Sequence, residues 1–132
     1  MISLLLPRYY SEKFLGIEDE VALKCKNAGL EYIVVNGLEP ESNRKVIELC
    51  ERHPHLLPAA GIYPLNAACH HINAEDFHTT WGFEAPPKFD VDEEIEWIDR
   101  MCLERKIVAV GECGLDGHYL KDENAMLEQV SG

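Results

Sequence analysis

The sequence contains no apolar run that approaches the ~18 residues needed to span a membrane. Its first ten residues, MISLLLPRYY, lack the basic stretch of a secretory signal peptide and are too short to form one. We therefore expect a cytoplasmic protein with no membrane partner. At 132 residues, 46% hydrophobic and 27% charged, the chain has the size and composition of one soluble domain.

Basic residues are also scarce. The 12 Lys and Arg face 24 Asp and Glu, which gives a formal net charge of −12. Proteins that bind duplex DNA without regard to sequence neutralise its phosphates with basic side chains, so this balance argues against that class. It leaves room for a nucleotide or strand end held through metal ions, because a bound cation supplies positive charge locally.

The cysteines lack any CxxC spacing, and their number, five, is odd. Neither a disulfide framework nor a structural zinc module is indicated, and we expect most of them to be reduced core residues. Cys69 precedes His70 and His71, a combination that can bind a soft metal. The alternative, which we prefer, is that these histidines and His78 belong to a solvated loop or short helix.

Apolar runs alternate with helical spacings along the chain. Asp90 and Glu93 resemble a capping box, and Pro58 weakens the third expected strand. The run that ends at 110 is typical of a fully buried parallel strand. Strands are expected at 2–6, 32–36, 56–62 and 108–110, and helices at 17–28, 40–52 and 91–102.

This alternation predicts an α/β fold of parallel β/α units with right-handed crossovers. A small doubly wound domain and the first half of a TIM-type (β/α)8 barrel both fit. A full barrel usually takes ~250 residues, so residues 1–132 would form a single partial domain with an open barrel. Its strand edges at 2–6 and 107–111 would invite a second copy of the chain or a complementary half-barrel chain.

A long loop is expected at about 63–90, between the third strand and the following helix. Structureless loops of this length are uncommon unless they are functional. If this one covers a pocket, Trp81 should be partly buried against Phe77 or Tyr63.

The segment VAVGECGLDG (108–117) places Glu112 where the fourth strand ends. Loops at the carboxyl ends of parallel strands converge on one edge of the sheet, where α/β folds gather ligands. Glu112 is therefore a candidate ligand-binding residue, and a loop acid that only caps or pairs locally remains the alternative. We expect Asp116 to fix the loop by accepting backbone N–H bonds.

Two segments together resemble the signature pair of the TatD family of metal-dependent hydrolases. AAGIYPLNA (59–67) is similar to its Gly-x-His-Pro segment, and IVAVGECGLDGHY (107–119) to its Gly-Glu-x-Gly-Leu-Asp segment. The resemblance implies a (β/α)8 barrel of the amidohydrolase type that acts as a phosphodiesterase, commonly described as a deoxyribonuclease. It implies Glu112 as a metal ligand, Mg, Mn or Zn as cofactor, and a nucleic acid or nucleotide substrate.

The sequence departs from the family pattern at the other ligands. At the position of the family's His-x-His pair, this sequence has roughly Ser3-Leu4-Leu5, with no histidine. Tyr63 replaces the histidine of the Gly-x-His-Pro segment. The family's remaining ligands, two histidines and an aspartate, would fall beyond Gly132. One glutamate cannot hold two metal ions, so we expect weak or absent metal binding and no activity from the chain alone.

Two functional hypotheses follow. The first is a TatD-type hydrolase represented by a truncated, split or frame-shifted chain, for which no catalytic residue besides the ligand is assigned. The second is a non-catalytic α/β module that descends from such an enzyme and serves in binding or assembly.

Overall fold

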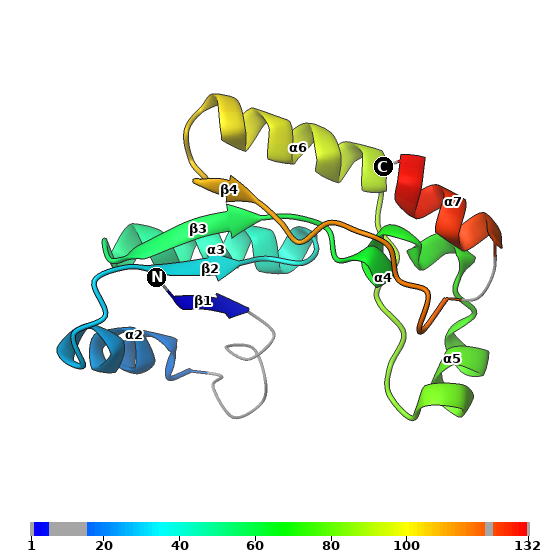
Figure 1. Ribbon diagram of the computed structural model, residues 1–132, viewed down its shortest axis with the longest axis horizontal. Coiled ribbons are helices and arrows are strands. Elements are labelled where there is room, and N and C mark those ends of the chain that lie inside the picture. The colour runs from blue at the N-terminus through cyan, green and yellow to red at the C-terminus, as the bar shows by residue number, and fades with distance from the viewer. Residues whose placement is uncertain (1, 6–15, 121–122, 132) are drawn as a thin grey trace.

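The computed structural model describes residues 2–5, 16–120 and 123–131, and for residues 2–5, 128 and 131 it describes the backbone only. Four parallel strands form one sheet whose spatial order is the order of the chain (Figure 1). The strands are β1 (Ile2–Leu5), β2 (Ile33–Asn36), β3 (Leu56–Ala60) and β4 (Ala109–Val110).

Helices connect the strands, and one further helix follows the last strand. The helices are α2 (Glu18–Asn27), α3 (Pro40–Arg52), α4 (Pro64–Ala67), the 3-10 helix η1 (Cys69–His71), α5 (Ala74–Trp81), α6 (Val91–Leu103) and α7 (Glu123–Ser131). In the described ranges, no helix has the length and apolar character to cross a membrane.

Strand order decides between the two expected architectures. Ile33 of β2 pairs with Ile2 on one side and with Leu56 on the other, and Ala109 of β4 pairs with Ala59. A doubly wound sheet reverses its strand order at a switch point, whereas barrel strands follow one another around the sheet. The α/β fold is therefore the partial TIM-barrel-like arrangement.

The main core lies between β2, β3, α2 and α3. Pro58, a residue type that disfavours strands, is nevertheless part of β3. Its carbonyl accepts a hydrogen bond from Val108 N–H at 2.8 Å. A second cluster packs α6 on β3 through Ile98 and Ala60. Members of the main core are Ala22, Ile33, Val35, Val46, Leu49, Cys50 and Leu56.

Carboxylates cap the starts of α3 and α6. The Asp90 side chain accepts from Glu93 N–H at 3.0 Å and begins α6, as the sequence indicates. The reciprocal capping box, however, lies at α3, where Glu39 accepts from Ser42 N–H and Ser42 Oγ accepts from Glu39 N–H. Glutamate at the N-cap is uncommon, so the sequence pattern favoured the aspartate.

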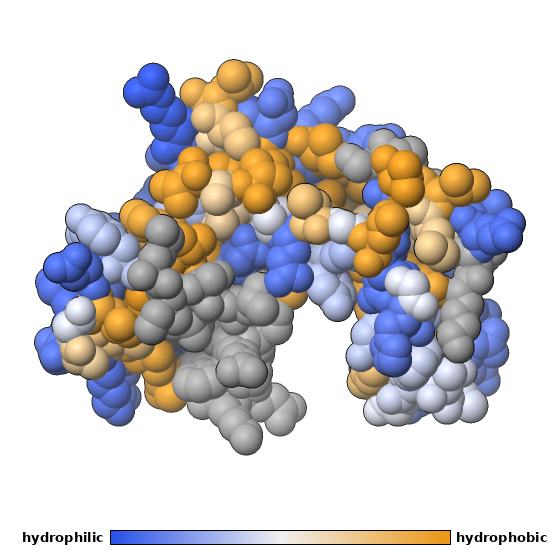
Figure 2. All heavy atoms as spheres, viewed as in Figure 1, coloured by the Kyte–Doolittle hydropathy of each residue, from blue (hydrophilic) through white to orange (hydrophobic). Residues whose placement is uncertain are grey.

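The prediction that 108–110 forms a fully buried strand is wrong. The strand is two residues long, and Val108 and Val110 are each 57% exposed. On the described part of the chain nothing pairs with the outer edge of β4, so this edge stays open, and both residues of the strand are exposed. Figure 2 shows apolar side chains gathered over the region of β4 and α6.

The expected long loop at 63–90 contains α4, η1 and α5. Asn73 caps α5 by accepting from two backbone N–H groups, and Gly82 ends it in the left-handed conformation. A third core cluster holds these short helices against α7 and includes Phe77, Tyr63 and the partly buried Trp81, as predicted.

The prediction that most cysteines are core residues holds only in part. All five are free thiols, and Cys50 and Cys69 are buried. Cys25 is half-buried, while Cys102 and Cys113 are exposed.

Candidate functional site

Glu112 lies where the carboxyl ends of β2, β3 and β4 meet. Gly111 N–H donates to the Ala60 carbonyl at 3.0 Å and extends the β3–β4 pairing past the strand end. The Asn36 side chain, at the end of β2, approaches the same glycine: its Oδ1 lies 3.7 Å from where a Cβ on Gly111 would stand. The half-buried Glu112 follows directly. The structure thus places the sequence-predicted residue at the mouth of the sheet.

Gly61 brings the ends of β3 and β4 together. A Cβ at Gly61 would stand 2.2 Å from the carbonyl carbon of Gly111 and 2.6 Å from Glu112 N, so only glycine fits. Beside this contact is a pocket of about 170 Å³, lined by three apolar side chains of α6, by residues that follow β3 and β4, including Glu112, and by Gln129 of α7.

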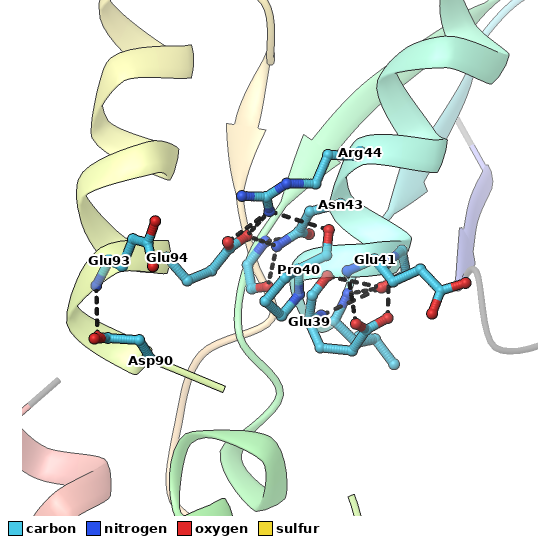
Figure 3. A network of polar contacts seen from close by, with 11 residues as sticks. Glu39, Pro40, Glu41, Asn43, Arg44, Asp90, Glu93 and Glu94 are labelled. Atoms are coloured by element: carbon cyan, nitrogen blue, oxygen red, sulfur yellow. Dashed lines mark hydrogen bonds and ion pairs between the residues drawn. The ribbon is translucent and has the colours of Figure 1, made fainter. Parts of the chain in front are cut away.

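A buried network of polar side chains from α3 and α6 holds Gly61 in place (Figure 3). Asn43 of α3 donates from Nδ2 to the Gly61 carbonyl at 2.9 Å and accepts from Gly61 N–H at 3.2 Å. Its Nδ2 also donates to Glu94 Oε1 of α6 at 2.8 Å. One side chain thereby ties α3, the end of β3 and α6 to one another.

Glu94 is 2% exposed and carries a charge that must be balanced. Arg44 of α3 donates to both Glu94 carboxylate oxygens at 2.5 Å. The Arg44 guanidinium lies 3.9 Å from the centroid of the Trp97 ring, which adds a cation–π contact. The pair joins two neighbouring β/α units at the same end of the sheet as Glu112.

Tyr63 stands in the position of the family's histidine and adjoins the acidic loop. Burial, together with the charges of Asp116 and Glu112 and the neighbouring Tyr119, raises the pKa of the Tyr63 phenol. Tyr63 N–H donates to the Leu38 carbonyl at 2.9 Å, which links the loops after β2 and β3. The phenol therefore remains neutral near pH 7 and can donate a hydrogen bond.

Asp116 shapes the loop that carries Glu112. Its Oδ1 accepts from His118 N–H at 2.8 Å and from Tyr119 N–H at 2.9 Å, as the sequence analysis expected. Asp116 N–H donates to Gln129 Oε1 at 2.8 Å, and Gln129 Nε2 donates to the Pro64 carbonyl at 2.8 Å. The buried Gln129 of α7 thus holds the Glu112 loop against the loop after β3.

The described side chains do not fit the two-metal centre that the family resemblance implies. Across residues 16–120 and 123–131, no group of three or more His, Cys, Asp or Glu is arranged to hold a metal ion. Glu112 offers one carboxylate, and Tyr63 replaces an imidazole with a phenol. The side chains of Ser3, Leu4 and Leu5, at the expected His-x-His position, lie outside the described residues.

Cys69 and His70 make structural contacts in the 3-10 helix η1. Cys69 is buried and its Sγ lies 3.9 Å from the Phe89 carbonyl, and His70 Nε2 lies 2.7 Å from the same oxygen. These contacts tie η1 to the segment that leads into α6. His78 of α5 lies 3.5 Å from Glu84 through Nδ1.

Sequence reasoning missed Asn43 and Glu94. A signal was present for Glu94: it lies three residues after Val91 and four before Ile98, on the apolar face of α6. A charged residue on such a face predicts a buried partner, but the partner's identity depends on tertiary packing. For Asn43, a polar residue three before Val46, the sequence gives no comparable indication.

The parallel β/α units and the chain-order sheet define a partial TIM-type barrel with an acidic residue just after β4. The family model described as TatD related DNase matches residues 7–130. The chain belongs to the TatD family. Its resemblance to single relatives is low.

Two curated relatives illustrate this. The uncharacterized metal-dependent hydrolase YabD of Bacillus subtilis is 26% identical over 112 residues, which cover 85% of this chain and 36% of YabD. The 3'-5' ssDNA/RNA exonuclease TatD of Cronobacter sakazakii is 25% identical over 125 residues, or 91% of this chain and 40% of that exonuclease. The chain thus spans well under half the length of these relatives.

Proposed function

We propose that the chain contributes four β/α units and the ligand Glu112 to a hydrolase that cleaves phosphodiester bonds in nucleic acids. The observation that carries this proposal is the position of Glu112 at the meeting point of three strand ends, held by the Gly61–Gly111 contact. The family and the printed names of the relatives support the substrate class and the use of a divalent metal ion. Mg²⁺, Mn²⁺ and Zn²⁺ are the candidate ions, and the cytoplasm the proposed location.

The remaining donors come from polypeptide outside these 132 residues. Two-metal hydrolysis needs several ligands in fixed geometry, and Glu112 alone does not provide them. The open edge of β4 and the exposed Val108 and Val110 offer a place for such polypeptide. It is a continuation of the same polypeptide, a complementary half-barrel chain or a second copy.

The test replaces the matching part of the Cronobacter sakazakii exonuclease with residues 16–132 of this chain, so that the exonuclease keeps its own first strand. We expect the chimera to degrade single-stranded DNA, Glu112→Gln to abolish the activity, and Glu104→Gln, an exposed glutamate at the end of α6, to leave it unchanged. Tyr63→His should raise the activity by restoring an imidazole donor. A folded chimera that stays inactive with histidine at 63 would refute the catalytic proposal.

The isolated chain provides the second arm of the test. With Mg²⁺, Mn²⁺ or Zn²⁺ present, we expect its hydrolysis of single-stranded DNA to equal that of buffer, and calorimetry to detect no tight divalent site. Cleavage that Glu112→Gln abolishes in a folded protein would show that the chain, or its dimer, supplies all ligands. Sedimentation would then test for the dimer, since a clean 15.0 kDa monomer excludes a shared site.

The replacement of a histidine by Tyr63 favours the second candidate, a non-catalytic module that binds a partner through the same open edge. Such a module would bind its partner equally well with Glu112→Gln, and its chimera would remain inactive. The chimera assay therefore separates the two functions.

A further inference from the structure

A hollow of about 370 Å³ lies beside α5, in the size range of small-ligand sites. One wall is aromatic: the Trp81 ring lies 5.0 Å from Tyr119 and 5.3 Å from His118, centroid to centroid. Phe83 meets both Phe77 and Tyr119 edge to face, with its ring centroid 5.6 Å from that of Tyr119. We call the three aromatic residues that line the hollow, Phe77, Trp81 and Tyr119, the aromatic wall. Its buried side packs on α7, while Phe83 and His118 are exposed.

We propose that this hollow binds an unpaired base of a single-stranded nucleic acid, stacked on Trp81 and Tyr119. The proposal rests on the proposed function and adds to it how the substrate is held. Bases stack on aromatic side chains irrespective of sequence, because every base presents a π face. An unpaired base is the form that can reach such a hollow, whereas a duplex keeps its bases stacked inside.

The charge of the hollow favours a base over a phosphate. Its described lining includes Asp76 and contains no Lys or Arg, and the whole chain carries a net charge of −12. A phosphate would be repelled there, whereas a base is neutral and offers hydrogen-bonding edges. Lining side chains that can meet such edges are His71, Asn73, Asp76 and Thr80.

The hollow also adjoins the loop that carries Glu112. Tyr63 packs in the same cluster as Trp81 and Tyr119 and also experiences the charges of Glu112 and Asp116. Tyr119 is itself fixed by the Asp116 carboxylate at 2.9 Å. A strand whose base lies on the aromatic wall would therefore have its backbone beside the mouth of the sheet.

Asp76 gives the hollow a base preference. An aspartate accepts a hydrogen bond from the exocyclic amino group of cytosine, whereas thymine presents a carbonyl oxygen at the same edge. Asp76 is exposed on α5, and its backbone N–H donates to the Asn73 cap, which fixes the position of its main chain. We therefore expect oligo(dC) to bind more tightly than oligo(dT).

The experiment measures binding of short fluorescein-labelled oligo(dC) and oligo(dT) to the 132-residue chain by fluorescence anisotropy, with EDTA present. Trp81→Ala should weaken binding by about tenfold or more, and Trp81→Phe should retain most of it. The control is Tyr32→Ala, an exposed aromatic residue that immediately precedes β2 and does not line the hollow, which should leave binding unchanged. Circular dichroism checks the fold of each variant.

Asp76→Asn provides an independent variant that removes no packed side chain. It should reduce or reverse the preference for oligo(dC), because an amide can also donate to the thymine carbonyl. Absence of saturable binding, or equal losses in Trp81→Ala and Tyr32→Ala, would overturn the proposal. EDTA prevents metal-dependent cleavage, so this assay measures binding alone. A lack of binding here is therefore a different result from a lack of cleavage by the chimera.

Discussion

Gly61 and Gly111 touch through their backbones at the ends of neighbouring strands. A methyl group on Gly61 would stand 2.2 Å from both the carbonyl carbon and the carbonyl oxygen of Gly111. Glu112 follows immediately, so the position of its carboxylate relative to β3 depends on this contact. The two glycines thus belong to the candidate site although neither carries a functional group.

Gly61→Ala should therefore destabilise the protein by about 1–3 kcal/mol, because the strand ends must separate to admit the methyl group. The matched control is Gly117→Ala, in the Glu112 loop, where an added Cβ meets nothing within 4 Å. Urea denaturation of the two variants measures the difference. Equal stability of both would contradict the contact.

Glu94→Gln should cost about 1–3 kcal/mol of unfolding free energy, because the Arg44 guanidinium loses its carboxylate partner while Asn43 keeps an acceptor. Glu96→Gln, an exposed position on the same helix, should change stability by no more than about 0.5 kcal/mol. Thermal and urea unfolding report both values. An equal effect at the two positions would show that the buried pair contributes nothing specific.

Thiol labelling should separate the cysteines by burial. Burial raises the pKa of the Cys50 thiol to about 12, so near pH 8 its thiolate fraction is about a thousandfold below that of an ordinary cysteine. Cys102 and Cys113 are exposed and should react with iodoacetamide first. Peptide mapping by mass spectrometry gives the order. In guanidinium chloride the differences should vanish, and fast labelling of Cys50 in the folded protein would refute its burial.

Tyr63 should make the protein sensitive to alkaline pH. Because its folded pKa is raised by burial and by the charges of Asp116 and Glu112, the neutral phenol stabilises the fold below the unfolded pKa of about 10. That contribution is lost as the pH rises through the folded pKa. Tyr63→Phe should therefore lose less stability above pH ~10 than the wild type.

Ultraviolet difference titration provides a direct check on the same residue. Asp116→Asn removes one of the charges that raise the Tyr63 pKa, so the phenol should ionise at lower pH in this variant. An unchanged or higher titration midpoint, with the fold intact, would show that the aspartate has no such influence.

The strands and the two long helices α3 and α6 were predictable because each depends on local pattern. Apolar runs specify strands, Pro40 and Asp90 mark helix starts, and strand ends locate Glu112. The exposure of Val108 and Val110 was not predictable, because burial depends on whether another strand covers β4. Glu94 was missed for a related reason: its partners on α3 are distant in sequence, and only the packed structure brings them together.

The chain-order sheet has a consequence for synthesis on the ribosome. Each strand pairs with the strand made immediately before it, so every pairing becomes available as soon as one further β/α unit emerges. The paired residues Ile2 and Ile33, Ile33 and Leu56, and Ala59 and Ala109 lie 31, 23 and 50 positions apart, so each pairing closes a single crossover. The nascent sheet can therefore grow from β1 to β4 without waiting for distant sequence, and its growing edge is always the strand made last.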